Sequence, residues 1–381
     1  MTRRDRLLAT LRGAPVDRPA VSFYELNGLD ENPADPDPFN IYLHPSWRPL
    51  IAMTRDRTDR IVMRSVPVRA AAPDPVAALT TKTIRIENGS RHVTTTIATG
   101  GRVLTGRTRR DPDVNTLWTT EHLLKDAADV EAYLALPEPP AGGVPDPAGV
   151  LAAEAALGDT GIVMINASDP LCAAASLFDM GDYTILAMTE RALFRRLLDR
   201  FAREILPRTE AVAAALPGRL WRIVGPEYAT APFLPPDLFR EYVTGYVTGM
   251  VAAIHRHGGF ARVHCHGNLR GVLDHIAATG AMGLDPVEPP PQGDVALRYV
   301  RERYGKQFVL FGNLEVSDIE ILPPDRFAEK VQQALDEGTA GEGRGFVLMP
   351  SACPYGRELP AGTLRNYAVI LDTLDRWAAN R

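Results

Sequence analysis

From residue 160 onward the sequence repeats one unit, in which a short apolar run is followed by a stretch with helical periodicity. Six such runs occur, and a seventh, RPAVSFYE at 18–25, lies near the start of the chain. Both faces of each run are apolar, as in parallel strands that are covered on both sides. Repeated βα units in this number predict an α/β fold of the (β/α)8 barrel type, with a doubly wound open sheet as the alternative. The six runs are 161–168, 220–227, 261–267, 282–289, 308–315 and 345–352, and the helical stretches are 190–216, 236–257, 269–279, 294–304, 325–337 and 361–378.

The segments before residue 160 differ from these units. Leu7, Leu8 and Leu11 recur at helical spacing, and Gly13 ends that pattern. Residues 28–40 are acidic and rich in proline, which is typical of a loop. Residues 60–120 alternate polar and apolar positions around the turn signals NG and GG, so we expect a β-meander that forms an insertion or lid within a single barrel domain spanning 1–381. Any further barrel strand is expected within 130–157.

Composition excludes several classes of function. The formal net charge is −5, so nucleic acid and anionic membrane surfaces are not expected partners. No run of about 18 apolar residues and no signal peptide are present, and three scattered cysteines do not form a disulfide framework. These features predict a cytoplasmic protein, a monomer or homodimer, that acts on a small-molecule substrate. No GxGxxG or GxxxxGK[ST] motif follows a strand, which argues against a dinucleotide or nucleotide site.

Polar residues gather where the predicted strands end, and the carboxyl ends of barrel strands converge on one mouth. In RVHCHGN, His264 and His266 are two positions apart on a strand and project to the same face, while Cys265 points away. Two imidazoles with Cys353 from a later strand end would give three N/S ligands, the usual number for a catalytic zinc. Glu227 is a candidate fourth metal ligand or general base. A purely structural H-x-H pair is the alternative.

Two stretches resemble the uroporphyrinogen decarboxylase superfamily. The opening RDRLLATLRGAPVDRPAV resembles its start, in which a helix is followed by "G-x-x-V/P-D-R-P-P-V". From VHCHGN to FGNLE, the chain resembles the order "H-x-C-G", a helix, "G-A-D" and "G-N-I/L". The resemblance covers nearly the whole chain, is weakest over 28–120, and implies a (β/α)8 barrel with its site at the carboxyl mouth.

The superfamily has two main branches, and the residues favour one of them. Its haem-pathway decarboxylases hold an acidic tetrapyrrole with arginines of an "R-Q-A-G-R" motif and use no metal. Here the corresponding stretch, SFYELNGLDENPADPDP, is acidic and has no arginine, so it would repel such a substrate. The other branch, the methylcobamide:thiol methyltransferases and related enzymes, binds Zn²⁺ through "H-x-C" and a later Cys. In those enzymes the zinc activates a thiol that takes a methyl group from a corrinoid.

Resemblance to this second branch implies a zinc-dependent methyltransferase. His264 matches the family histidine, His266 replaces the cysteine, and Cys353 lies at or next to the late cysteine, while Glu227 lies where related enzymes carry an acidic residue. With His in place of Cys the site is less anionic, so a bound thiolate would be less nucleophilic. No corrinoid-binding "D-x-H-x-x-G" occurs, so methylcobalamin would come free or on a partner corrinoid protein.

Further site residues follow from their places near strand ends. Tyr24, Asp169 and Arg357 are expected to face the substrate, Arg357 as the cation for a carboxylate or phosphate. Asn313 and Glu288 are assigned to cofactor binding. Two other functions stay open: a decarboxylase or lyase acting on a small carboxylic acid, with or without a metal, and a member that only binds a ligand.

Overall fold

Eight parallel strands form one sheet in the computed structural model, which describes residues 1–140 and 142–381. The strands follow one another in chain order, and the first and last in the sheet meet where the backbone N–H of Asp59 donates to the carbonyl of Val21 at 2.7 Å. The predicted (β/α)8 barrel is therefore confirmed. Its strands are β1 (Ala20–Val21), β2 (Arg60–Arg64), β9 (Gly161–Ser168), β10 (Leu220–Val224), β11 (Phe260–His264), β12 (Gly283–Asp285), β13 (Val309–Leu314) and β14 (Gly345–Pro350).

Seven barrel strands lie in the runs that the sequence indicated, and the eighth does not. Strand β2, RIVMR, was assigned to the meander because its polar ends continue the alternation of the residues that follow it. The meander therefore begins later than residue 60. Among the described residues of 130–157, which exclude residue 141, there is no barrel strand. This segment holds most of α3 (Ala127–Leu134), α4 (Ala148–Leu157) and the short β8 (Val144–Pro145), which pairs with β3 (Val68–Arg69) outside the barrel.

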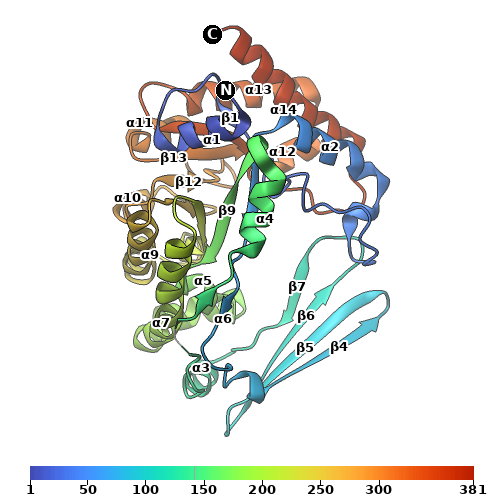
Figure 1. Cartoon of the computed structure of the whole chain (residues 1–381). Coiled ribbons are helices and arrows are strands. Elements are labelled where there is room, and N and C mark those ends of the chain that lie inside the picture. The colour runs from blue at the N-terminus through green and yellow to red at the C-terminus, as the bar shows by residue number, and fades with distance from the viewer. Residues whose placement is uncertain (141) are drawn as a thin grey trace.

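The meander is a four-stranded antiparallel sheet inserted between β2 and β9. It consists of β4 (Thr80–Glu87), β5 (Ser90–Ala98), β6 (Val103–Arg110) and β7 (Leu117–Glu121). Asn88 and Gly89 join β4 to β5 with φ of 50° and 80°, as a two-residue hairpin turn requires. Figure 1 shows these strands (cyan) beside the barrel, and one end of the sheet reaches the acidic loop, where Arg91 pairs with Asp37 at 3.0 Å.

Helices surround the barrel, and those expected from sequence periodicity are present. None of the helices over the described residues combines the length and apolarity that a bilayer crossing requires. Besides α3 and α4 the helices are α1 (Arg3–Arg12), α2 (Arg48–Arg57), α5 (Pro170–Ala175), α6 (Met180–Thr189), α7 (Arg191–Ala215), α8 (Pro236–Phe239), the π-helical η6 (Arg240–Thr244), α9 (Gly245–Arg256), α10 (Leu273–Ala278), α11 (Leu297–Tyr304), α12 (Val316–Ile321), α13 (Pro324–Gly338) and α14 (Ala361–Ala379). The short 3-10 turns are η1 (Ile41–Leu43), η2 (Pro45–Trp47), η3 (Ala77–Leu79), η4 (Gly158–Thr160) and η5 (Pro226–Ala229).

Alternate strand residues form two separate hydrophobic cores. Ile162 and Met164 of β9 belong to the inner core of the barrel, whereas Val163 and Ile165 pack outward against the helices. This division follows the two-residue period of a strand. Towards the carboxyl ends the inward positions become polar, as at Arg262 of β11. The inner core is therefore apolar at its base and polar at the mouth.

Candidate active site at the barrel mouth

Two histidines lie side by side at the carboxyl end of β11. The ring centroids of His264 and His266 are 4.5 Å apart, with planes at 87°. Nδ1 of His264 lies 2.7 Å from Oδ2 of Asp285, and Nδ1 of His266 lies 2.8 Å from Oε1 of Glu288. Cys265 is fully buried in the outer core. A carboxylate thus orients each imidazole through Nδ1, and no described residue forms a hydrogen bond to Nε2 of either ring.

The two imidazoles differ in their affinity for a proton. Burial lowers the pKa of His264 to about 4, because desolvation outweighs the attraction of Asp285. Burial acts the same way on His266, but the hydrogen bond and charge of Glu288 outweigh it and raise the pKa above its ordinary value. The same contact lowers the pKa of Glu288 against the effect of burial. At neutral pH His264 is therefore uncharged, and Glu288 favours the charged form of His266.

A row of polar side chains crosses three neighbouring strands next to the histidine pair. Arg262 on β11 is in register with Arg222 on β10, which is in register with Asn166 on β9. Arg222 donates from Nη1 to Oδ1 of Asn166 at 3.2 Å, and Nε of Arg262 lies 2.9 Å from Oδ1 of Asp285. Burial disfavours the charge of Asp285, but Arg262 and the hydrogen bond with His264 hold its pKa at about 2. The carboxylate therefore links the arginine row to the histidine pair.

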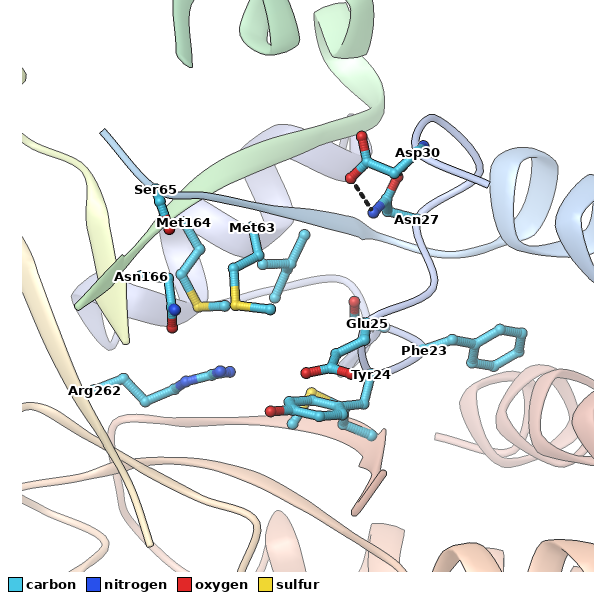
Figure 2. Close-up of a pocket in the computed structure, with 13 residues that line it drawn as sticks. Phe23, Tyr24, Glu25, Asn27, Asp30, Met63, Ser65, Met164, Asn166 and Arg262 are labelled. Carbon is cyan, nitrogen blue, oxygen red and sulfur yellow. Dashed lines mark hydrogen bonds between the residues drawn. The ribbon is translucent and has the colours of Figure 1, made fainter. Parts of the chain in front are cut away.

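A cavity of about 260 Å³ opens between this row and the segment that follows β1. Figure 2 shows the guanidinium of Arg262, the amide of Asn166 and the ring of Tyr24 around it. The ring of Tyr24 also stacks on His264, with centroids 5.7 Å apart. Apolar side chains form much of the remaining wall: Ile61, Met63, Met164 and Met349. Tyr24, which was expected to face the substrate, thus joins the cavity to the histidine pair.

Glu25 lines the cavity and contacts Cys353. The Cys353 thiol lies 3.5 Å from Oε2 of Glu25. Burial, together with the charge of Glu25, raises the pKa of this thiol above its ordinary value, so it is protonated at neutral pH. Glu25 has φ of 59°, and Val287, next to Glu288, has φ of 53°. Non-glycine residues rarely adopt such angles, which are strained and gather at functional sites.

Glu227 and Asp169 are buried acids that follow β10 and β9. Oε2 of Glu227 accepts the N–H of Gly225 at 3.0 Å, and burial raises the pKa of Glu227. Asp169 caps α5, where Oδ1 accepts the N–H of Cys172 at 2.7 Å, and burial raises its pKa well above the ordinary value. Asp169 does not line the cavity. The charge of Glu227 favours the protonated form of His266, but Glu227 forms no hydrogen bond with that ring among the described residues.

Arg357 and Asn313, also predicted for the site, lie away from the cavity. Nη1 of Arg357 donates to the carbonyls of Pro38 and Pro112, both at 2.9 Å, and its backbone N–H donates to the carbonyl of Asp113 at 2.7 Å. Its side chain is thus engaged in joining loops. Asn313 lines a separate cavity of about 210 Å³, which α13 also borders.

Sequence reasoning missed Arg222, Arg262 and Asp285. Each is a charged residue inside an apolar run, and a charge covered on both faces needs a buried partner. Arg262 also has the same parity along its strand as His264, so it was bound to point inward. Gly283 makes room for it, because a Cβ at that position would lie 3.2 Å from Cβ and Cγ of Arg262. A charged residue at an inward-facing position of an apolar strand was therefore the feature of the sequence that could have identified Arg262.

The model of one protein family, uroporphyrinogen decarboxylase (URO-D), matches residues 120–364, which is well over half of the chain. The chain belongs to the URO-D family. The match includes all barrel strands from β9 to β14, and therefore the histidine pair and the arginine row. Tyr24 and Glu25 of this URO-D family member lie before the matched segment.

A solved structure has a fold similar to that of this URO-D family chain. No curated protein matches it in sequence. A methyltransferase from Methanosarcina mazei is similar in structure, with a TM-score of 0.61 at 16% identity over 99% of each chain. A putative fructose-1,6-bisphosphate aldolase from Coccidioides immitis covers 61% of this chain and 76% of its own, at 11% identity and a TM-score of 0.26. The first likeness shows that the same architecture extends over the whole chain.

The residues of this URO-D family member supply only part of the ligand set that the implied zinc ion requires. His264 and His266 carry the Nδ1 partners that metal-binding histidines have. Cys353 instead contacts Glu25, and Glu227 accepts a backbone N–H. Within residues 1–140 and 142–381, no group of three or more His, Cys, Asp or Glu is arranged to hold a metal ion. The structure thus brings together two of the four predicted ligands.

Proposed function

We propose that this URO-D family enzyme transfers a methyl group from a corrinoid to a small thiol or other acceptor at the barrel mouth. The observation that carries the proposal is the histidine pair, in which His264 and His266 are each oriented by a carboxylate on Nδ1. Nε2 of each ring is the atom that would hold a zinc ion, and Cys353 would be the third ligand only after leaving Glu25 and losing its proton. Zinc would supply a Lewis acid that lowers the pKa of a thiol.

The chain's own residues would orient the acceptor and remove its proton. In the transfer, a carbon–cobalt bond breaks, its electron pair stays on cobalt, and a carbon–sulfur bond forms as the thiol proton leaves. Glu227 is the proposed acceptor of that proton, because burial raises its pKa towards the operating pH. Tyr24, stacked on His264, would cover the reacting group on one side. The corrinoid, free or carried by a partner protein, would approach the open mouth.

The charge and size of the cavity argue against a tetrapyrrole polycarboxylate as substrate. Glu25 and Asp30 line it, and Glu31 is buried nearby at the same segment. Asp30 is paired with Arg64 at 2.7 Å, which leaves that arginine engaged. A ligand with many carboxylates would be repelled by this rim. The volume of about 260 Å³ is also below the usual range for drug-sized ligands, so a macrocycle does not fit.

Metal content and methyl transfer together test the proposal. The purified protein is analysed for zinc by mass spectrometry, and methylcobalamin is incubated with it and a panel of small thiols while loss of the carbon–cobalt absorption is followed. We expect about one zinc per chain and thiol-dependent demethylation. His264→Ala should lose both. His92→Ala, on the meander strand β5, is the matched histidine control and should retain both.

Three results would count against this function. Native protein without stoichiometric zinc would remove the zinc-dependent mechanism. Release of CO2 from small carboxylic acids, measured in parallel and without methyl transfer, would support the decarboxylase alternative instead. Equal zinc content in His264→Ala and His92→Ala would show that the histidine pair does not bind the metal.

A further inference from the structure

Several polar atoms around the cavity have no hydrogen-bond partner in the part of the chain that the structure describes. They include Nη2 of Arg262, Nε of Arg222 and the hydroxyl of Tyr24. Arg262 is 1% exposed and Tyr24 6%. Buried polar groups in folded proteins nearly always have partners, because an unpaired one loses its hydration without compensation. Their gathering at one cavity indicates a missing partner there.

The same atoms are arranged around one space. Figure 2 shows the guanidinium of Arg262 directed into the cavity, with the hydroxyl end of Tyr24 and the amide of Asn166 facing the same region. Arg222, which lies between Arg262 and Asn166 in strand register, donates to Asn166, and its guanidinium lies 5.5 Å from the ring centroid of Tyr24. Because Gly283 has no Cβ, the side chain of Arg262 can pack directly against it. The two arginines are thus carried on the barrel strands β10 and β11, and Tyr24 lies on the segment that follows β1.

We propose that this cavity binds the carboxylate of a small ligand, with Arg262 and Tyr24 as its hydrogen-bond donors and Arg222 as a second positive charge. This deepens the proposed function, on which it rests in naming the acceptor as a carboxylic acid. A single carboxylate suits the charges better than a phosphate dianion. Asp285 already neutralises one arginine, and Glu25 adds a negative charge to the lining. Arg262 presents planar donors that match a carboxylate.

The other residues that line the cavity indicate which chemical groups the remainder of the ligand carries. Met63, Met164 and Met349 line it with polarisable thioethers, which accommodate an apolar or aromatic body. Glu25 offers a carboxylate that can accept a hydrogen bond from a hydroxyl, thiol or amine of the ligand. The volume of about 260 Å³ limits the ligand to less than drug size. The ligand is therefore a small acid with an apolar middle and a hydrogen-bond donor.

Calorimetric titration with a matched acid and amide tests the proposal without requiring catalysis. The probes are 4-hydroxybenzoate and 4-hydroxybenzamide, which differ in charge but hardly in shape, followed by phenylacetate and phenylacetamide. We expect at least one acid to bind at least tenfold more tightly than its amide. Asn166→Asp adds a negative charge facing the cavity while keeping a partner for Arg222, and should weaken acid binding at least tenfold with little effect on the amide. Arg262→Met should abolish the preference.

Arg200→Met is the control for removing a buried arginine. Arg200 is 8% exposed and donates to the carbonyls of Leu136 (3.0 Å) and Pro137 (2.7 Å), outside the cavity. The Arg200→Met variant should bind the acids in preference to the amides as strongly as the wild type does. Failure of both acids to bind better than their amides, or a preference that survives both Asn166→Asp and Arg262→Met, overturns the proposal. Methyl transfer restricted to uncharged acceptors would also overturn the carboxylate proposal while leaving the proposed function intact. Acid binding without methyl transfer would support the carboxylate proposal and overturn the proposed function.

Discussion

Replacing Asp285 with asparagine should destabilise the protein strongly. Asp285 is 0% exposed, its Oδ1 lies 2.9 Å from Nε of Arg262, and its Oδ2 lies 2.7 Å from Nδ1 of His264. The substitution keeps the shape of the side chain but removes its charge. Arg262 is then a buried cation without a counter-charge, and breaking a buried pair in this way costs about 3–5 kcal/mol.

The loss can be expressed as a change in melting temperature. With an unfolding entropy of about 2.1 cal/mol/K per residue, a chain of 381 residues loses roughly 1 °C or slightly more for each kcal/mol. Asp285→Asn should therefore melt about 5 °C below the wild type. The double variant Asp285→Asn/Arg262→Met removes both charges, and replacing a buried pair by apolar groups is often neutral, so it should recover most of the loss.

Urea unfolding followed by circular dichroism, with calorimetry for the melting temperature, measures these values. Asp375→Asn is the control, because Asp375 is an exposed partner of Arg57 and its loss should change stability by less than about 0.5 kcal/mol. The reasoning is refuted if Asp285→Asn loses less than about 1 kcal/mol. It is equally refuted if the double variant is no more stable than the single one, because the unpaired Arg262 would then not be the cause.

Three further predictions concern protonation and the mouth. As the pH falls from 6.5 to about 4, unfolded chains protonate His264 while the folded chain does not, so wild type should lose up to about 3 kcal/mol more stability than His264→Asn in urea unfolding. Parallel curves for the two proteins would contradict this. Glu288→Gln should lower the pKa of His266, followed by NMR titration, because burial then acts without an opposing carboxylate; an unchanged pKa would count against the pairing. Arg357→Ala should increase protease cleavage within 80–121 and leave 4-hydroxybenzoate affinity unchanged. A loss of affinity would place Arg357 at the cavity after all.

The barrel could be predicted because its strands are apolar on both faces and recur with helices between them. Strand β2 could not, since RIVMR has an arginine at each end and resembles the alternating residues next to it. The histidine pair followed from the two-residue period of a strand, which depends on no other part of the chain. By contrast, the importance of Arg262 depends on Asp285 and on Arg222, which only register between strands brings to it. Ligand geometry at Cys353 depends on a loop conformation that no periodicity specifies.

The contacts of Arg357 join three loops from distant parts of the chain. Its side chain holds the carbonyls of Pro38 and Pro112, while Val114 forms a bridge with Gly356, close to Cys353. The acidic loop, the loop between β6 and β7 and the loop after β14 are therefore joined to one another by direct hydrogen bonds. A change in the position of the β6–β7 loop would therefore shift the loop that carries Cys353, because the two are joined directly through Arg357 and Gly356.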